Sequence, residues 1–112
     1  MTLVEEIYAV TRMFPRDERF GLTGQMRRAA VSIVSNIGEG SCRRRDRTFA
    51  YLLDVALGSQ GELEVQLEIA YRLRYCSQED YKRLAERAAS VGRMLNRLRA
   101  AVASRQPQVP SV

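Results

Sequence analysis

The sequence predicts an all-α protein that folds as an antiparallel, up-down-up-down four-helix bundle. Apolar residues recur at steps of three and four in four segments, the spacing that places them on one face of a helix. Aromatic residues make up 7% of the chain and Trp is absent, a composition that favours helices over strands. Because 112 residues suffice for one core, we expect a single domain over residues 1–105. Residues 106–112 contain two prolines and should form a disordered tail.

The first helix should begin at a Thr2 cap, because Leu3, Ile7 and Val10 then share one apolar face. It should stop before Pro15, since the residue ahead of a proline is poorly suited to a helical backbone. The polar residues PRDERFG follow as a loop.

A second apolar face begins at Leu22 and predicts a helix that extends to the glycines near position 40. Gly38 and Gly40 are expected to end this helix, because glycine is the usual residue at a helix C-terminus. The next loop is then GSCRRR. The predicted apolar face consists of Leu22, Met26, Ala29, Ala30, Ile33 and Ile37.

The third helix is the longest, with Asp46 placed to cap its start and an end near Tyr75. Two glycines in GSQG, residues 58–61, each cost about 1 kcal/mol relative to Ala inside a helix. The apolar stripe keeps its phase across them, so we predict a continuous helix, with a break into two helices as the alternative. Small residues there would let another helix approach closely: Ala56, Gly58, Ser59 and Gly61.

A fourth helix is predicted after Ser77, which together with Asp80 resembles a capping box with Asp in the acidic position. Short loops of about four to seven residues between such helices favour antiparallel neighbours and hence the up-down-up-down order. The apolar stripe of this helix consists of Tyr81, Leu84, Ala88, Val91, Leu95, Leu98 and Val102.

No apolar run reaches the roughly 18 to 20 residues of a membrane span, and the N-terminal residues MTLVEEIYAV are acidic where a secretory signal is basic. We therefore expect a cytoplasmic protein that does not enter a membrane.

Cys42 and Cys76 flank the longest helix and should lie about 40 Å apart as free thiols. Two thiols without any His are too few soft ligands for zinc, haem or iron, so no metal or cofactor is predicted. A site in which carboxylates bind a hard cation remains an alternative.

The chain carries a net charge of +5, and Lys82 is the single lysine among 18 basic residues. Guanidinium groups match the geometry of phosphate, so this composition suits a polyanionic partner such as RNA or DNA. Residues 48–71 hold no basic residue, whereas the charged residues from Lys82 onward are basic except for Glu86. We therefore expect the molecule to be acidic in its middle and basic at its ends.

Four arginines cluster at the junction of the second and third helices. Charge-assisted bonds from such a junction to phosphate need no contact with bases. No aromatic residue is interleaved with them, so base stacking is not predicted and sequence specificity should be poor. A solvated run of surface charge is the alternative. The predicted nucleic-acid-binding residues are Arg43, Arg44, Arg45 and Arg47, with Arg27 and Arg28 extending the patch.

A polar stripe runs along the second helix beside its apolar face. Folding this helix back on the third places Arg28 roughly opposite Ser59 and within reach of an ion pair with Glu62. We predict a polar clamp that fixes the register of the two helices, with a ligand-binding row as the alternative. The clamp consists of Gln25, Arg28, Ser32, Asn36, Glu39, Ser59 and Glu62.

Two stretches carry a family resemblance, FPRDERFGLTGQMRRAAVSIVSNIGEG and FAYLLDVALGSQGELEVQLEIAYRLRY. They resemble the four-helix-bundle proteins encoded by intervening sequences in bacterial 23S rRNA genes, over nearly the whole chain from Leu3 to Leu98. Phe20, where members often have Tyr, and Gly38, where Ala is usual, depart from the pattern, and the common Trp of the first helix is missing. The matching positions include Phe14, Pro15, Glu18, Gly21, Leu22, Gln25, Arg28, Ser32, Asn36, Glu39, Gly40, Gly58, Ser59 and Glu62.

The resemblance implies an assembly. Members of this family are similar to the accessory protein of diversity-generating retroelements, a positively charged bundle that forms a ring of five and binds a reverse transcriptase and nucleic acid. This implies a homopentamer whose partners are RNA or DNA, or a reverse transcriptase or other nucleic-acid-processing protein. Apolar residues beyond the needs of one bundle seam agree with self-association, namely Val55, Leu57, Val65 and Ile69.

Three classes of function remain, of which we favour a non-enzymatic module that binds nucleic acid, or a protein that processes it, through a basic surface. The second is a protein–protein scaffold without nucleic acid. The third is an enzyme that acts by electrostatics alone, as chorismate mutase-like bundles do with arginines. However, no Ser or Cys has a recognisable base beside it and no phosphate-binding loop follows a strand. Residues that could line such a pocket are Arg28, Asn36, Glu39 and Glu62.

Overall fold

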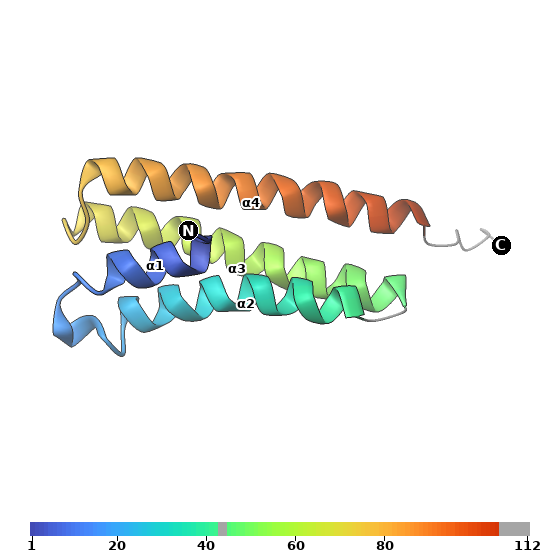
Figure 1. Ribbon diagram of the computed structural model, residues 1–112, viewed down its shortest axis with the longest axis horizontal. Coiled ribbons are helices and arrows are strands. Elements are labelled where there is room, and N and C mark those ends of the chain that lie inside the picture. Colours follow the sequence, from blue (N-terminus) through green and yellow to red (C-terminus); the bar gives the residue numbers. More distant parts are fainter. Residues whose placement is uncertain (43–44, 106–112) are drawn as a thin grey trace.

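A computed structural model describes residues 1–42 and 45–105, and all regular structure in these residues is helical (Figure 1). The prediction of an all-α protein with four helical segments is therefore confirmed. The predicted tail, residues 106–112, lies outside the described residues. In chain order the elements are α1 (Leu3–Thr11), the 3₁₀ helix η1 (Arg16–Glu18), α2 (Leu22–Cys42), α3 (Asp46–Arg72) and α4 (Gln78–Arg105).

Helix α1 is much shorter than the helices that form the body of the molecule. It has 9 residues against 28 in α4, so at 1.5 Å per residue it spans about 14 Å and α4 about 42 Å. Helix α2 leads from η1 to the opposite end, α3 returns beside it, and α4 runs back along α3 (Figure 1). Helix α1 packs on α2 and α4 in one half only. The other half is therefore built from α2, α3 and α4.

Apolar side chains from all four α-helices meet in one core. Every predicted apolar face supplies residues to it, and Ile37, which is half-buried, packs against it. Burial of each large aliphatic side chain contributes about 2 kcal/mol. Within the described residues, no helix is long and apolar enough to span a membrane. The largest fully buried side chains are Ile7, Met26, Ile33, Leu53, Leu63, Leu67, Leu84, Leu95 and Val102.

The start of α1 follows the predicted pattern. The Thr2 hydroxyl accepts a hydrogen bond of 3.2 Å from the Glu5 amide, and the Glu5 carboxylate accepts one of 2.9 Å from the Thr2 amide. The amide of Thr2, and secondarily its hydroxyl, lowers the pKa of Glu5. The prediction of a cap at Thr2 is confirmed.

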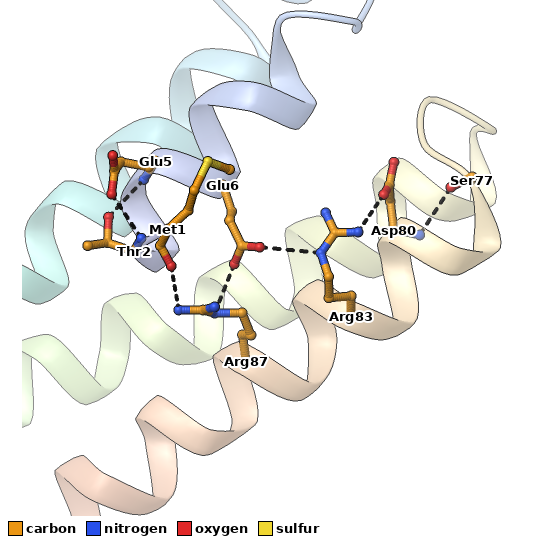
Figure 2. Close-up of polar contacts among 8 residues, drawn as sticks. All are labelled: Met1, Thr2, Glu5, Glu6, Ser77, Asp80, Arg83 and Arg87. Atoms are coloured by element: carbon orange, nitrogen blue, oxygen red, sulfur yellow. Dashed lines mark hydrogen bonds and ion pairs between the residues drawn. The ribbon is translucent and has the colours of Figure 1, made fainter.

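The buried carboxylate of Glu6 joins α1 to α4 (Figure 2). Arg83 donates a hydrogen bond of 3.3 Å from Nε to Glu6 Oε1. The Nε of Arg87 lies 2.8 Å from Glu6 Oε2 and forms an ion pair with it. Because α1 packs on α4 over a short stretch only, these two contacts hold the short helix against the long one.

The predicted end of α2 at Gly38 and Gly40 is wrong, because the helix continues through both glycines to Cys42. Gly40 is buried against α3, and a Cβ added there would lie 2.5 Å from a carbon of the Phe49 ring. Glycine at this position therefore allows α2 and α3 to approach closely, which is a different role from that of a helix stop.

Helix α3 is continuous across GSQG, residues 58–61, as predicted. No described helix of this chain makes the expected close approach at its glycines, since a Cβ on Gly58 or Gly61 would meet nothing within 4 Å. The close approach lies instead at Gly92 of α4, where a Cβ would lie 2.7 Å from Nε2 of Gln60. That buried Nε2 donates a hydrogen bond of 2.9 Å to the carbonyl of Ala88, which ties α3 to α4 at this point.

Asp46 does not cap α3 as predicted but is the first residue of the helix. Arg45 occupies the cap position with an extended backbone and makes no side-chain capping bond. The Asp46 carboxylate lies at the positive end of the helix dipole and accepts a hydrogen bond of 3.3 Å from Arg105 at the end of α4. Its charge is therefore used to join the ends of two helices.

Helix α3 ends at Arg72, earlier than the predicted end near Tyr75. The chain turns through Arg74, whose φ of 63° lies in the left-handed region that favours glycine. The amide of Tyr75 donates to the Ala70 carbonyl and the amide of Arg74 donates to the Tyr71 carbonyl, which is the Schellman arrangement. An arginine thus occupies a position for which glycine is better suited.

The predicted cap of α4 at Ser77 is confirmed, because its hydroxyl accepts a hydrogen bond of 3.0 Å from the Asp80 amide. The Asp80 carboxylate does not serve a capping box. It accepts a hydrogen bond of 2.7 Å from Arg83 and so joins the group of charges around Glu6 (Figure 2).

Replacing Arg74 by glycine should stabilise the fold. The change removes the left-handed strain of a residue with a Cβ, about 1 kcal/mol, and the Arg74 side chain is exposed. We expect the midpoint of thermal unfolding, followed by circular dichroism, to rise by about 4 to 8 °C. Arg74→Ala is the control, because it removes the same charge and keeps the Cβ. An equal rise in both variants would show that the gain comes from removal of the charge and would contradict an effect of backbone strain.

Replacing Glu6 by alanine should lower the free energy of unfolding by about 2 kcal/mol, because two charge-assisted contacts between α1 and α4 are lost. Urea unfolding measures this change. Glu86→Ala is the matched control, since its ion pair with Arg93 is exposed and should contribute less than about 0.5 kcal/mol. Similar losses in the two variants would show that Glu6 has no special role.

Candidate nucleic-acid interface

Two of the predicted arginines, Arg45 and Arg47, lie at the junction of α2 and α3 with exposed side chains. Arg43 and Arg44 lie outside the described residues. Within the part of the chain that the structure describes, Arg45 and Arg47 have no ion-pair partner, whereas Asp46 between them is engaged by α4. The junction therefore presents free guanidinium groups that can bind phosphate.

Arg27 and Arg28 do not extend this junction. Because α2 ends at Cys42, Arg28 lies about 21 Å further back along the helix axis. Arg27 lies beside α1, where its Nε donates a hydrogen bond of 2.9 Å to Thr11 Oγ1 and its guanidinium lies 4.6 Å from the Tyr8 ring centroid. The predicted arginines thus belong to two separate surfaces.

A second basic surface, which the sequence pattern did not predict, surrounds the connection between α1 and α2. It is a groove of about 650 Å³, named here the connection groove. The exposed ring of Phe20 lies at its rim. The sequence signal is weak, because the basic residues are spread over a helix end, a 3₁₀ turn and a second helix. They are Arg12, Arg16, Arg19 and Arg27.

Glu18 holds this connection in place. Its Oε1 accepts a hydrogen bond of 3.2 Å from the Leu22 amide at the start of α2, and its Oε2 accepts one of 2.7 Å from the Tyr75 hydroxyl. The Tyr75 ring also packs on Phe14, with ring centroids 5.4 Å apart. The hydrogen bond to Glu18 raises the pKa of Tyr75. The carboxylate of Glu18 is therefore engaged by the fold, and the arginines of the groove do not share it.

Most basic residues of α4 are paired with carboxylates, so the C-terminal segment is less basic than its sequence predicts. Arg12, Arg16 and Arg19, in contrast, have no ion-pair partner among the described residues. Unpaired charges dominate the local field, so positive potential gathers at the connection groove and at the α2–α3 junction. The pairs of α4 are Arg83 and Arg87 with Glu6, Arg93 with Glu86, Arg99 with Asp54, and Arg105 with Asp46.

Part of the predicted clamp joins α2 to α3. The hydroxyl oxygens of Ser32 and Ser59 lie 2.8 Å apart in a hydrogen bond. Asn36 donates to the Ser32 hydroxyl at 3.1 Å and to its carbonyl at 2.7 Å. Gln25 and Glu39, at the two ends of the stripe, are exposed. Of the predicted clamp, the structure thus brings together Ser32, Asn36 and Ser59.

The predicted ion pair between Arg28 and Glu62 does not form, and among the described residues neither side chain has another ion-pair partner. Both line an open groove of about 770 Å³ between the two helices, named here the α2–α3 groove. Val65 and Ile69 expose apolar surface there. Gln66 is buried in its wall, and its Oε1 lacks a hydrogen-bond partner in the residues that the structure describes. The groove therefore presents unpaired charges of both signs beside apolar surface.

Cys42 and Cys76 are free thiols, as predicted. Burial, and to a lesser extent the charge of Asp80, raises the pKa of Cys76. Because the thiolate is the reactive form, Cys76 is a weak nucleophile at neutral pH.

The sequence matches the family model described as 23S rRNA-intervening sequence protein over residues 1–97. Among solved structures, the chain is similar to a protein of unknown function from the S23 ribosomal protein family of Bacteroides thetaiotaomicron, with a TM-score of 0.78. The two are 22% identical, and the match covers 88% of each chain. At this identity the similarity shows the shared fold alone. No match was found among curated proteins.

Wild type and the Tyr75→Phe variant should differ in free energy of unfolding at neutral pH and become similar at alkaline pH, because the hydrogen bond from Tyr75 to Glu18 is then lost. The pKa of Tyr75 is raised above its ordinary value of 10.0, so the contribution of this bond is complete below pH 10.0 and is lost as the pH rises through the raised pKa. Urea unfolding from neutral pH to about pH 11 measures the difference. Tyr51→Phe, at an exposed tyrosine, is the control. A difference between wild type and Tyr75→Phe that stays constant with pH would contradict the assignment.

Proposed function

The chain belongs to the 23S rRNA-intervening sequence protein family, and from this premise we propose that it is a non-enzymatic protein that binds nucleic acid through a basic surface. It acts in the cytoplasm as a homopentamer of antiparallel four-helix bundles. Its protein partner in this proposal is a nucleic-acid-processing protein such as a reverse transcriptase.

The distribution of unpaired arginines carries the proposal. The chain has a net charge of +5, and five exposed guanidinium groups at the connection groove and the α2–α3 junction have no carboxylate partner among the described residues. Paired arginines must give up a carboxylate before they bind phosphate, whereas these groups bind it directly. They are Arg12, Arg16, Arg19, Arg45 and Arg47.

The α2–α3 groove supports self-association with a second copy of the chain. Val65 is 57% and Ile69 is 42% exposed, so the groove has apolar surface as well as the charges of Arg28 and Glu62. A second copy can bring a carboxylate to Arg28 and a guanidinium to Glu62, so that one contact pairs both charges and covers the apolar surface. Gly61 lines the same groove with open space in place of a side chain, which leaves room for a neighbouring helix.

Light-scattering mass, measured with and without a short single-stranded RNA, tests both parts of the proposal. We expect a mass near five times 12.7 kDa that rises when RNA is added at low salt. Between about 50 and 200 mM salt, the affinity should fall by about 50-fold if four phosphates of a single strand are bound. A monomer that binds neither RNA nor DNA at low salt would overturn the proposal. A pentamer that binds neither would overturn its nucleic-acid part and favour the scaffold.

The same assay has a matched pair of variants. Arg45→Ala with Arg47→Ala removes two unpaired charges, whereas Arg93→Ala with Arg99→Ala removes two that are paired with Glu86 and Asp54. We expect about a tenfold loss of RNA affinity in the first double variant and about twofold or less in the second. Equal losses would show that net charge alone sets the affinity.

A further inference from the structure

The connection groove contains an exposed aromatic ring among its arginines. Phe20 is 87% exposed, so its ring contributes little to the core. The guanidinium of Arg19 lies 5.4 Å from the ring centroid, a cation–π distance that places the ring beside a positive charge. A ring held at the surface among cations is the arrangement on which nucleobases stack in proteins that bind single strands.

The charges around this ring are available to a ligand. Arg12, Arg16 and Arg19 have no ion-pair partner within the described ranges, 1–42 and 45–105. Arg27 donates its Nε to the neutral hydroxyl of Thr11, so its positive charge is not cancelled. Four cations therefore line one groove without a carboxylate bound to any of them.

The 3₁₀ turn sets the spacing of two of these cations. Arg16 is the first residue of η1, and Arg19 is its C-cap with a helical backbone. In a 3₁₀ helix residues three apart lie above one another, about 6 Å apart along the axis. The two arginines thus form a short row on one side of η1, which can follow neighbouring phosphates of an extended strand. Of the two carboxylates between them in sequence, Glu18 is engaged by Leu22 and Tyr75, and Asp17 forms no ion pair with either arginine among the described residues.

We propose that the connection groove binds a segment of single-stranded nucleic acid, with one base stacked on Phe20 and the adjoining phosphates bound by Arg12, Arg16 and Arg19. This inference rests on the proposed function and gives it a location and a strand preference. A base within a duplex has both faces covered by its neighbours, whereas a base in a single strand can stack on the ring. The groove volume of about 650 Å³ lies within the range of sites that hold small ligands, about 300 to 1,000 Å³.

The α2–α3 junction provides the comparison. Tyr51 is 65% exposed and lies one helical turn after Arg47, so it also combines a ring with a free arginine. The connection groove surrounds its ring with more cations, which is why we assign the stacked base to Phe20.

The chain contains no Trp, so Phe20→Trp places a single indole at the proposed stacking position and Tyr51→Trp places one at the comparison position. Single-stranded RNA, single-stranded DNA and an RNA duplex, all short, are titrated at low salt. We expect either single strand to quench the fluorescence of Phe20→Trp through stacking, and the duplex to leave it unchanged. Tyr51→Trp should be quenched less than Phe20→Trp by either single strand.

Affinities measured by anisotropy with labelled oligonucleotides complete the test. Phe20→Ala should lower the affinity for single strands about tenfold and the affinity for duplex by about twofold or less, because one stacking contact is lost. Phe20→Tyr keeps a ring and should retain the affinity. Thermal unfolding should be unchanged in these variants, since the ring is exposed.

The outcomes separate the inference from the proposed function. An equal loss on single strands and duplex in Phe20→Ala, or quenching in Tyr51→Trp alone, would overturn the inference and leave the proposed function in place. A wild-type protein that binds neither single strands nor duplex at low salt would overturn the proposed function, and the inference with it.

Discussion

The carboxylate of Glu18 is the constraint on which the basic end of the molecule depends. One of its oxygens accepts the Leu22 amide at 3.2 Å and the other accepts the Tyr75 hydroxyl at 2.7 Å, so the α1–α2 connection is joined to the turn between α3 and α4. Hydrogen bonds to an ionised group are stronger than those between neutral groups, and both oxygens make one. These bonds anchor the backbone that carries the arginines, which lowers the entropy cost of ordering the connection when a ligand binds.

The helices could be predicted from the sequence because a bundle is specified largely by the period of its apolar residues. The continuity of α3 across GSQG followed from the phase of that stripe alone. The roles of single glycines could not be predicted, because they depend on what lies opposite in another helix. Gly40 faces the Phe49 ring and must lack a Cβ, whereas Gly58 faces open space. How two helices cross decides which residue lies opposite a glycine, and this cannot be predicted from the local sequence.

The candidate site was harder to predict, because charges that are close in sequence need not be free in space. The basic residues after Lys82 form a conspicuous run, yet Arg83 is paired with Glu6 across 77 residues of sequence. The arginines of the connection groove are separated by acidic and apolar residues, so they do not form a basic run in the sequence. Of the two carboxylates within their own turn, Glu18 is used to cap α2 and to bind Tyr75, and Asp17 forms no ion pair with them among the described residues.

The two grooves lie on different faces of α2, and this separation matters for the proposed assembly. Arg27 lines the connection groove and its neighbour Arg28 lines the α2–α3 groove, because successive residues of a helix point in different directions. The grooves share no lining residue, so subunits can meet through the α2–α3 groove without using the residues that line the connection groove. A stack on one ring with a few phosphate contacts is a weak site on its own. Repeated around an assembly, such sites act on one strand together, and the effective concentration of each raises the affinity of the whole. Stacking accepts any base, so this arrangement favours tight binding with little sequence preference.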